Sequence, residues 1–582
     1  MYMAMITSCR GGSSGCCAPS FPQTALAVLA LIGGLSGSGC RTAAGHAARA
    51  NRAAEEHIDK ARGRAGLPGA PHPWERAETT LRNRLIERQA LPLPRDFPPA
   101  QATGGAESPG GGDPHVLTLT DALRVAAAGS REYQDAKDKV FRAALKLDTE
   151  SDAFRTSFEG VLSGAFDDQR EADRRGLTGT VRAGISRTFE TGAVIASRLT
   201  LDVVKLLTLD RASAYGLAWD ASATIPLLRG GGREVVRAGV TQAEWDLVYA
   251  LWEFERFKRR HAVSIAQSYY RVLELRRQVL NYEENYRSLR AVALRSRVLA
   301  QAGRLAEVQV SQAEQDVLRA LDRRNRARSD ADQAADQLKQ SLGLPVDARL
   351  TFDDGALDAL DAPPDSAPAA EEIHAWVTGA LERRLDLASA VRRVDDADRA
   401  ARVAANALET ALGLKLSGAS GARRNLAGAA EGDAQLRFGD GNYSALLETD
   451  LPWSRVPQRN AYRDRQVEAA AARRALEARV DEVKLDIRNG WRRRDDARDS
   501  FAIQSAALEL SQRRVDNTRM LQEAGRAQMR DLLEAEEARL NAQNGLVSAM
   551  ISYRIAEWAL WRDAELLQVT DEGLIHDPID NP

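Results

Sequence analysis

Two stretches of the chain alternate between apolar and polar residues in the manner of β-strands. In the first, alternation covers 181–189, pauses at a Thr-Gly turn and resumes to about 203, and a further strand is expected at 215–225. The second stretch predicts strands at 412–416, 434–438 and 443–451. A period of two is typical of strands with one apolar and one wet face.

Each strand-like stretch is followed by a very long helix-like run. Apolar residues step by threes and fours from 233 to 301, which predicts a helix roughly 100 Å long at 1.5 Å per residue. This helix breaks at Ala302-Gly303-Arg304 and returns to about residue 342. In the second half, a long helix runs to about 523, breaks at Ala524-Gly525-Arg526 and returns to about 566.

Shorter helices are expected ahead of the strands. Thr118 and Asp121 form a capping box, and helix is expected from there to about 155. The matching helix of the second half spans about 371–411. Helices this long and amphipathic need partners in water, so we expect side-by-side packing with two shorter helices stacked end to end along each long one.

The order helix, strands, long helix, return helix therefore occurs twice, as in a tandem duplication. The strand-to-helix junctions IPLLRGGGR (225–233) and LPWSRVPQR (451–459) share a proline and two arginines at the same spacing, namely Pro226, Arg229 and Arg233 in the first and Pro452, Arg455 and Arg459 in the second. A proline suits the end of a strand. The arginines are interpreted either as solvated residues that begin the helix or as contacts to lipid headgroups or a neighbouring chain.

These patterns divide the chain into successive segments. We expect a lipoprotein signal peptide at 1–39, a lipidated N-terminus and flexible tether at 40–115, a first repeat at 116–345, an inter-repeat linker at 346–370, a second repeat at 371–570 and a C-terminal tail at 571–582.

The cysteines indicate export. All four lie in the first 40 residues, and Cys40 follows an apolar run at 24–35 and a group of small residues. This arrangement is typical of a bacterial lipoprotein signal, in which the cysteine is lipidated. Ordinary export with cleavage nearby is the alternative, because Gly37 stands where such signals carry Leu or Val. The apolar run is too short to span a membrane.

Composition and charge exclude several classes of function. The 80 Lys and Arg against 82 Asp and Glu leave no basic excess for nucleic acid. Aromatic residues make up only 5%, which suits long helices packed closely side by side. The seven histidines show no metal-ligand spacing, and Gly230-Gly231-Gly232 lacks the lysine of a phosphate loop. We therefore expect no enzyme, cofactor or metal site.

The strands of one chain are too few to close a barrel, which needs about eight, so several chains must pool them. An exported chain with half-apolar strands and long soluble hairpins suggests a membrane barrel that carries a periplasmic helical tube.

With LTLTDALRVA at 117–126, the two junctions and the two helix breaks, the chain resembles the TolC-like family of outer-membrane efflux proteins, specifically its lipoprotein members. The resemblance implies a mostly α fold with a membrane β part: a homotrimer whose 12-helix α-barrel joins a 12-stranded β-barrel in outer-membrane lipid. It implies a passive exit duct of a tripartite efflux or type I secretion system, docked to a periplasmic adaptor and an inner-membrane pump of RND or ABC type.

Residues 156–225 are longer than their counterpart 412–451 and hold an extra hairpin at about 178–203, which leaves the strand count open.

The resemblance also assigns roles to residues near the helix breaks. Gly303 and Gly525, with Arg304 and Arg526, would form the tips that engage the adaptor; ordinary turns are the alternative. Asp531 and Glu534, one helical turn apart, would form an acidic ring at the periplasmic aperture. Their counterparts in the first repeat are Gln309 and Gln312, and a solvated helix face is the alternative. The competing function is an exported coiled-coil scaffold or adaptor-like lipoprotein without a pore.

Overall fold

The computed structural model describes residues 42–67, 81–89, 115–169, 174–207, 213–360, 362–363, 370–451, 453–524, 526–570 and 572–576. Cys40, Pro452 and Gly525 lie outside these ranges. The chain divides into two units. The sheet unit contains Ala153–Pro226 and Gly413–Glu448, and the helical unit contains most of the rest from Ala54 onward.

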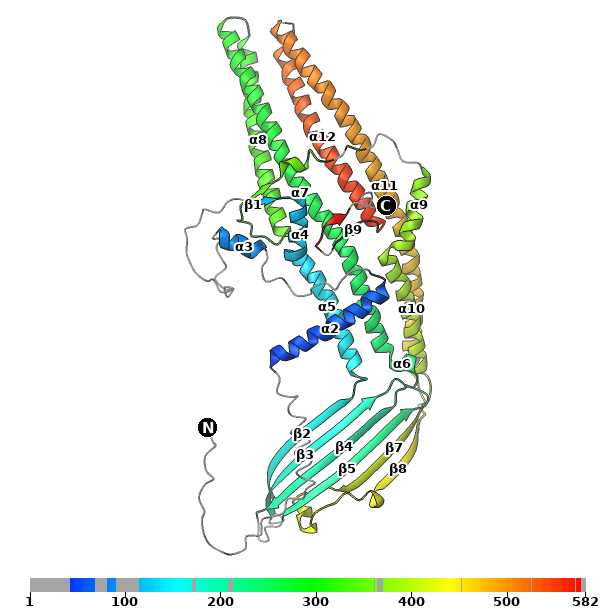
Figure 1. Cartoon of the computed structure of the whole chain (residues 1–582). Coiled ribbons are helices and arrows are strands. Elements are labelled where there is room, and N and C mark those ends of the chain that lie inside the picture. Colours follow the sequence, from blue (N-terminus) through cyan, green and yellow to red (C-terminus); the bar gives the residue numbers. More distant parts are fainter. Residues whose placement is uncertain are drawn as a thin grey trace, which may run out of the picture. The chain divides into compact units, whose positions relative to one another are not determined.

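The sheet unit is one sheet of six strands in the order β2-β3-β4-β5-β7-β8 (Figure 1). The strands are β2 (Ser157–Gln169), β3 (Arg174–Thr188), β4 (Val194–Leu206), β5 (Ser213–Pro226), β7 (Ala411–Ala422) and β8 (Asn442–Asp450). The pairs from β2 to β7 are antiparallel. The first repeat thus supplies four strands and the second two, so the extra hairpin expected at 178–203 is confirmed as β3 and β4.

One predicted strand does not form. Residues 434–438 hold a single ladder-like bond, from the Ala434 amide to the Tyr215 carbonyl at 2.7 Å, and then turn into the short 3-10 helix η4 (Phe438–Asp440). The earlier 3-10 helix η3 (Ala427–Glu431) belongs to the same connection between β7 and β8. The alternation at 434–438 therefore describes a loop that folds against the sheet.

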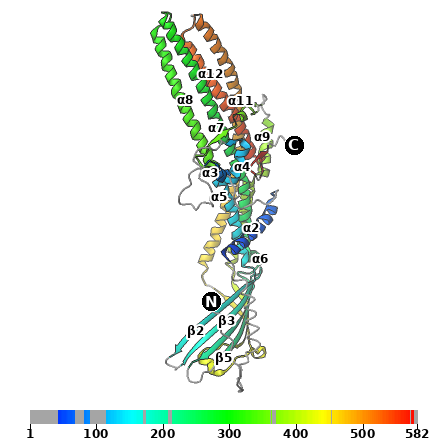
Figure 2. The ribbon, with the colours of Figure 1, turned by 60° about the vertical axis from the view of Figure 1, so that its left-hand side comes forward.

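Two long helical hairpins dominate the helical unit, as the sequence predicts (Figure 2). The first consists of α7 (Ala238–Gln301), which follows the short α6 (Arg233–Val236), and α8 (Glu307–Ser341). The second consists of α11 (Val456–Glu523) and α12 (Met529–Asp563). The two hairpins pack on each other chiefly through α7 and α12. At 64 residues, α7 is about 96 Å long.

Each long helix has shorter helices beside it, also as predicted. Helices α4 (Leu119–Gly129) and α5 (Arg131–Asp152) lie along α7, and α9 (Ala370–Arg383) and α10 (Leu385–Asn406) lie along α11. The prediction of one continuous helix at each place is wrong, because Ser130 and Arg384 adopt extended backbone. Arg384 is held there by hydrogen bonds to Asp386 and Asp486.

Part of the range expected to be a flexible tether is folded against the helical unit. In α2 (Ala43–Ala65), Ile58 is fully buried, and the indole of Trp252 donates to the Ala65 carbonyl at 3.2 Å. In α3 (Leu81–Arg88), Leu85 joins the main core. Residues 40–115 are therefore not a tether throughout.

The main core lies at the level where both repeats meet. Tyr269 of α7 is fully buried, packs against Phe352, and donates from its hydroxyl to the Leu117 carbonyl at 3.1 Å. Two small sheets border this core: β1 (His115–Leu117) pairs in parallel with β6 (Leu350–Phe352), beside the 3-10 helix η2 (Asp354–Ala356), and β9 (Gln568–Val569) pairs with β10 (Ile575–His576). Within the described ranges, every helix is too short or too polar to cross a membrane.

Candidate functional site

The six-stranded sheet has one apolar and one polar face. Cross-strand partners share a face, so the register of the strand pairs assigns each side chain to one face. One face carries large apolar residues, many of them exposed: Phe158, Leu162, Phe166, Leu177, Val181, Ile185, Leu199, Leu201, Val203, Leu217 and Trp219. The opposite face carries Glu159, Thr180, Arg182, Arg198, Thr200, Asp202, Asp220, Lys415 and Ser417.

The exposure of the apolar face is unusual for a sheet in water. Leu162 is 82% exposed and Phe158 67%. A contiguous apolar surface of this kind indicates a membrane or a protein partner. The strands are 9 to 15 residues long, and about 9–11 tilted residues cross a bilayer.

Side chains on the polar face pair with one another across neighbouring strands. Thr180 donates to Asp202 at 2.9 Å, and Arg198 lies 4.0 Å from Asp220. Strands β2 and β8 each have a neighbour on one side only among the described strands. A sheet with two unpaired edges and an apolar face needs further strands to complete it.

Both strand-to-helix junctions contact the turn at residues 406–410, between α10 and β7. Arg455 donates to the Leu408 carbonyl and lies 3.3 Å from the Thr410 hydroxyl. Its counterpart Arg229 donates from its amide to the Thr410 carbonyl and pairs through its side chain with Asp450 at 3.3 Å. Both arginines therefore have polar partners within the chain.

The remaining junction residues differ from one another. Pro226 ends β5 as predicted, and Pro452 lies outside the described residues. Arg459 is exposed and lies in the first turn of α11, where its amide donates to the Arg455 carbonyl at 2.8 Å. Arg233 begins α6, and its carbonyl accepts from the Arg237 amide at 3.0 Å.

The first helix break is a glycine-capped turn. Gly303 has φ +71°, the left-handed region that favours glycine. Its amide donates to the Ala300 carbonyl at 2.9 Å, and the Arg304 amide donates to the Leu299 carbonyl at 2.9 Å. This pair of bonds is the Schellman motif. Arg304 is exposed at the tip.

The second break repeats part of this geometry. The Arg526 amide donates to the Leu521 carbonyl at 2.8 Å, which matches the bond from Arg304 to Leu299. Arg526 is exposed, and Gly525 lies outside the described residues.

Asp531 and Glu534 lie just beyond this tip, and each has a partner within the chain. Asp531 is the third residue of α12 and accepts from the amide of the N-cap Gln528 at 2.9 Å, which forms a capping box. Glu534 pairs with Arg530 at 2.8 Å and faces Arg514 at 3.9 Å. Gln309 holds the same position in α8 as Asp531 in α12. Gln312 and Glu534 line one shallow pocket of about 180 Å³.

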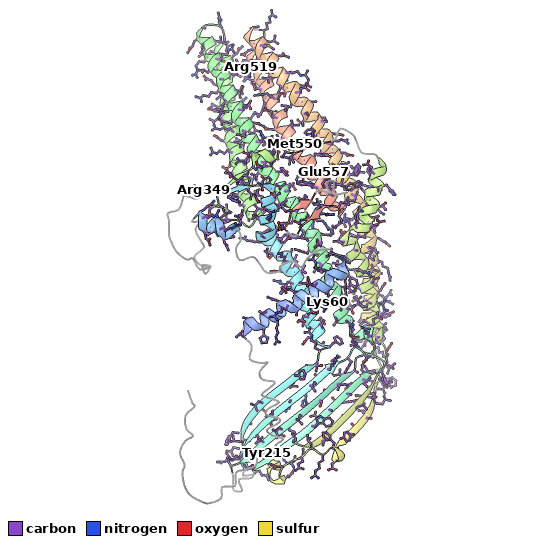
Figure 3. All side chains as sticks on the ribbon, in the orientation of Figure 1. Lys60, Tyr215, Arg349, Arg519, Met550 and Glu557 are labelled. Atoms are coloured by element: carbon purple, nitrogen blue, oxygen red, sulfur yellow. The ribbon has the colours of Figure 1, made fainter. Side chains whose placement is uncertain are left out.

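A buried carboxylate near the tips was not predicted. Glu536 of α12 has a fully buried side chain that accepts from Ser288 of α7 at 3.0 Å and pairs with Arg519 of α11 at 2.9 Å, so it links three helices. Figure 3 labels Arg519 close to the ends of the hairpins. Glu536 lies at helical spacing from Leu533 and Leu540. An acid within such an apolar stripe is the signal that could have identified it.

A buried ionic network near the main core was also missed. Asp386 accepts from Arg384 at 2.8 Å and forms an ion pair with Arg256 at 2.6 Å, and Arg256 also pairs with Glu565 at 3.1 Å. Burial alone would raise the pKa of Asp386, but the hydrogen bond from Arg384 and the charge of Arg256 outweigh it and hold that pKa below its usual value. This network joins α7 of the first repeat to α10 of the second.

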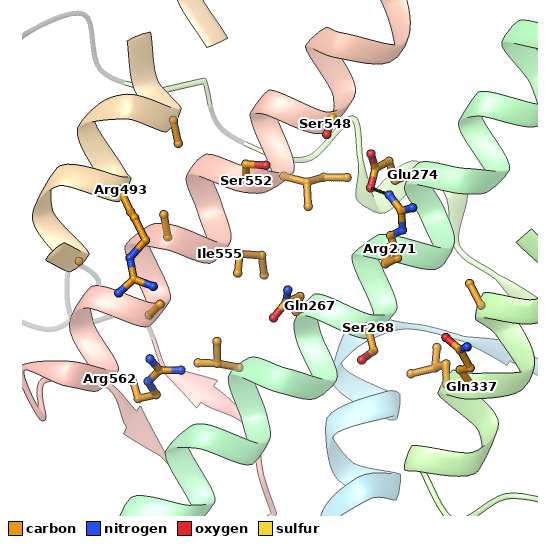
Figure 4. A pocket seen from close by; sticks show the side chains of 18 residues that line it. Gln267, Ser268, Arg271, Glu274, Gln337, Arg493, Ser548, Ser552, Ile555 and Arg562 are labelled. Carbon is orange, nitrogen blue, oxygen red and sulfur yellow. Dashed lines mark hydrogen bonds and ion pairs between the residues drawn. The ribbon is translucent and has the colours of Figure 1, made fainter. Parts of the chain in front are cut away.

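A groove of about 820 Å³ lies between the hairpins (Figure 4). Its polar lining comes mainly from Gln267, Arg271, Glu274, Arg493, Ser552 and Arg562, and Arg271 pairs with Glu274 at 2.9 Å. Nothing in it resembles a nucleophile with an adjacent base. In the described part of the chain, no three His, Cys, Asp or Glu side chains are grouped to hold a metal.

Comparison with known proteins identifies the fold. No protein-family model matches the chain, and no curated protein matches its sequence. Several solved outer-membrane channels share its fold. The CmeC outer membrane channel of Campylobacter jejuni has a TM-score of 0.56 at 14% identity, over 80% of this chain and 88% of CmeC. The outer membrane protein VceC of Vibrio cholerae has a TM-score of 0.56 at 14% identity, over 77% and 95%.

The open state of the MtrE outer membrane channel of Neisseria gonorrhoeae has a TM-score of 0.55 at 15% identity, over 77% of this chain and 88% of MtrE. The match extends over both repeats of a mostly helical chain with a sheet part, which is the architecture expected from the sequence. The chain therefore has the fold of the TolC-like outer-membrane channels, and at the level of the fold the resemblance stated from its sequence is confirmed.

Proposed function

We propose that this protein is an outer-membrane channel that serves as the exit duct of an efflux or secretion system. The observation that carries the proposal is the amphipathic sheet. Its exposed apolar face suits lipid, its charged face suits water, and its two free edges call for further strands. Water inside and lipid outside a closed barrel satisfy all three features.

Three copies of the chain form the channel in this proposal. Strand β8 of one copy pairs with β2 of the next, and alternating strand directions make that pairing antiparallel. Six strands from each of three copies make 18, in place of the 12 that the family resemblance implies. With strands about 4.8 Å apart and tilted about 40°, such a barrel is about 36 Å across at the backbone, against about 24 Å for 12 strands.

The helical hairpins of the three copies form the periplasmic tube in the same proposal. Four long helical rows from each chain would give the 12-helix α-barrel. The two tips, at Gly303 and Arg304 and at Gly525 and Arg526, engage a periplasmic adaptor, which links the duct to an inner-membrane pump of RND or ABC type. Asp531 and Glu534 would lie at the periplasmic aperture, and Cys40 would carry the lipid anchor. The support is the exposed Schellman turn and the matching bond in the second repeat.

Ion conduction through planar lipid bilayers tests this proposal. The purified full chain should open steps of constant conductance. Leu162→Arg places a charge on the apolar face, which costs about 2–4 kcal/mol near the bilayer centre, and should sharply reduce the number of inserted channels. Ser163→Arg, the matched control on the polar face of the same strand, should insert normally. A wild-type protein that never conducts, or two variants that insert equally, would contradict the proposal.

A further inference from the structure

The connection between β7 and β8 folds back over the polar face of the sheet. Residues 423–432 are here called the fold-back segment. They contact the start of β3, the end of β4 and the start of β5. The Arg423 guanidinium donates to Asp202 of β4 at 3.0 Å, and the Arg424 amide donates to the same carboxylate at 3.2 Å. Asp202 belongs to the polar face, since its register partners are Thr180 and Gly216. The carboxylate thus fixes the segment to that face.

Apolar contacts hold the segment in the same place. Leu426 is 2% exposed and packs against Val204 of β4 and Ala214 of β5. Both residues occupy the polar face, where apolar side chains are otherwise uncommon. They form a local apolar patch that matches Leu426. Because Leu426 is buried on the polar face, the segment is packed against the sheet there.

Two strand glycines provide the space for the segment. A Cβ added to Gly216 of β5 would lie 2.5 Å from the Arg424 amide nitrogen, and one added to Gly176 of β3 would overlap the Leu426 side chain. Both glycines are on the polar face. Glycine within a strand commonly marks the close approach of another segment of backbone.

The far end of the segment is also fastened. The Arg424 side chain donates to the Gly432 carbonyl at 2.8 Å, and the Tyr215 amide donates to Asp433 at 2.9 Å. Figure 3 labels Tyr215 at this end of the sheet. The segment therefore leaves β7, crosses the polar face and returns to the edge of β5 with both ends bonded.

We propose that the fold-back segment is a constriction that limits the size of the solutes that pass through the channel. This inference rests on the proposed function, in which the polar face lines the lumen. An 18-stranded barrel alone would leave a wide aqueous pore. Three fold-back segments, one from each copy, project inward at one level and narrow that pore. The half-exposed Arg423 side chain then faces the passing solutes.

Bilayer conductance and polymer exclusion of designed variants test the constriction. Replacing residues 425–431 by two glycines removes most of the segment, including Leu426, and Asp202→Arg breaks its ion pair with Arg423 without shortening the chain. Each change should raise single-channel conductance about twofold or more, because conductance follows the open area, and should admit larger polyethylene glycols. The double variant Asp202→Arg with Arg423→Asp restores the ion pair and should return conductance to the wild-type value.

Asp168→Asn is the matched control, because the pair of Asp168 with Arg175 at 3.1 Å lies at the same end of the sheet on its opposite face. It should leave conductance unchanged. Wild-type conductance and polymer exclusion in both opening variants would overturn the constriction while leaving the channel intact. A wild-type protein that forms no channel would overturn the proposed function and the constriction with it.

Discussion

Arg519 and Glu536 form an ion pair, with Nη2 2.9 Å from Oε1, in which the carboxylate is fully buried and the guanidinium is about half exposed. Arg539 reaches the other carboxylate oxygen at 3.0 Å. The pair ties α11 to α12 close to the tips, while Ser288 brings in α7. The hairpin ends are thus held to each other by polar contacts around one buried acid.

Removing that acid should loosen the tips. Glu536→Gln leaves two arginines without their counter-charge, and breaking such a pair costs about 1–3 kcal/mol when the cations are partly exposed. Amide hydrogen exchange in residues 515–540 should become faster. Glu537→Gln is the control, because Glu537 pairs with Arg323 at the surface at 2.9 Å and should cost under about 1 kcal/mol. Equal exchange in both variants would show that the buried pair does not hold the tips.

The turn at Gly303 should respond to any side chain. Gly303→Ala forces a Cβ into φ +71°, which costs about 1 kcal/mol. Gly63 lies inside α2 with nothing within 4 Å of an added Cβ, so Gly63→Ala should instead stabilise by about 0.5–1 kcal/mol. Urea unfolding measures both. A stabilising Gly303→Ala would contradict the glycine-capped turn.

The two arginines of the second junction should differ. Arg455→Ala removes the guanidinium that donates to the Leu408 carbonyl and the Thr410 hydroxyl. It should lower the free energy of unfolding by about 1–2 kcal/mol. Arg459 is exposed, with no side-chain partner among the described residues, so Arg459→Ala should change stability by under about 0.5 kcal/mol. Thermal unfolding followed by circular dichroism compares them, and equal losses would contradict the assigned contacts.

Acidification should weaken the packing of α5 on α7 through His261. Burial lowers the pKa of His261 below its usual 6.5, and the nearby charge of Glu132 opposes the shift only in part. The ring is 7% exposed and stacks on Phe257 at 5.2 Å. The unfolded chain binds the proton of His261 more tightly than the folded chain does. The contribution of the neutral ring to the free energy of unfolding is therefore fully present above pH 6.5 and is lost as the pH falls below that value.

His261→Phe should keep the stack and remove the proton site. Between pH 7.5 and 5.5 the wild-type protein should lose more stability than this variant, as measured by urea unfolding at each pH. Identical slopes for wild type and His261→Phe would rule out the buried histidine as the cause.

Sequence patterns identified the elements that repeat a simple period. The alternation at 181–203 and the three-four spacing of 233–301 predicted β3, β4 and α7 because one face of each is apolar over many residues. The glycine at 303 predicted the tip, since few other residues adopt its backbone. Strand β2 was not predicted; Gly160 and Gly164 interrupt its apolar face and weaken the alternation.

Long-range contacts determined what the sequence did not predict. The extended residue Arg384 interrupts a continuous helical pattern because Asp486, about a hundred residues away, binds its side chain. Arg423 and Asp202 are 221 positions apart, and neither lies in a motif. The strand at 434–438 was a wrong prediction because its alternating residues fold against β5 as a loop. Such features depend on tertiary neighbours, which local periodicity does not record.

Electron cryomicroscopy of the detergent-extracted protein would count both the copies and the strands of the channel. We expect particles of three copies, with β8 of each copy paired to β2 of the next in a closed barrel of 18 strands. Single copies, rings of another number, or a sheet whose edges stay unpaired would contradict the proposal that this chain forms a trimeric outer-membrane channel.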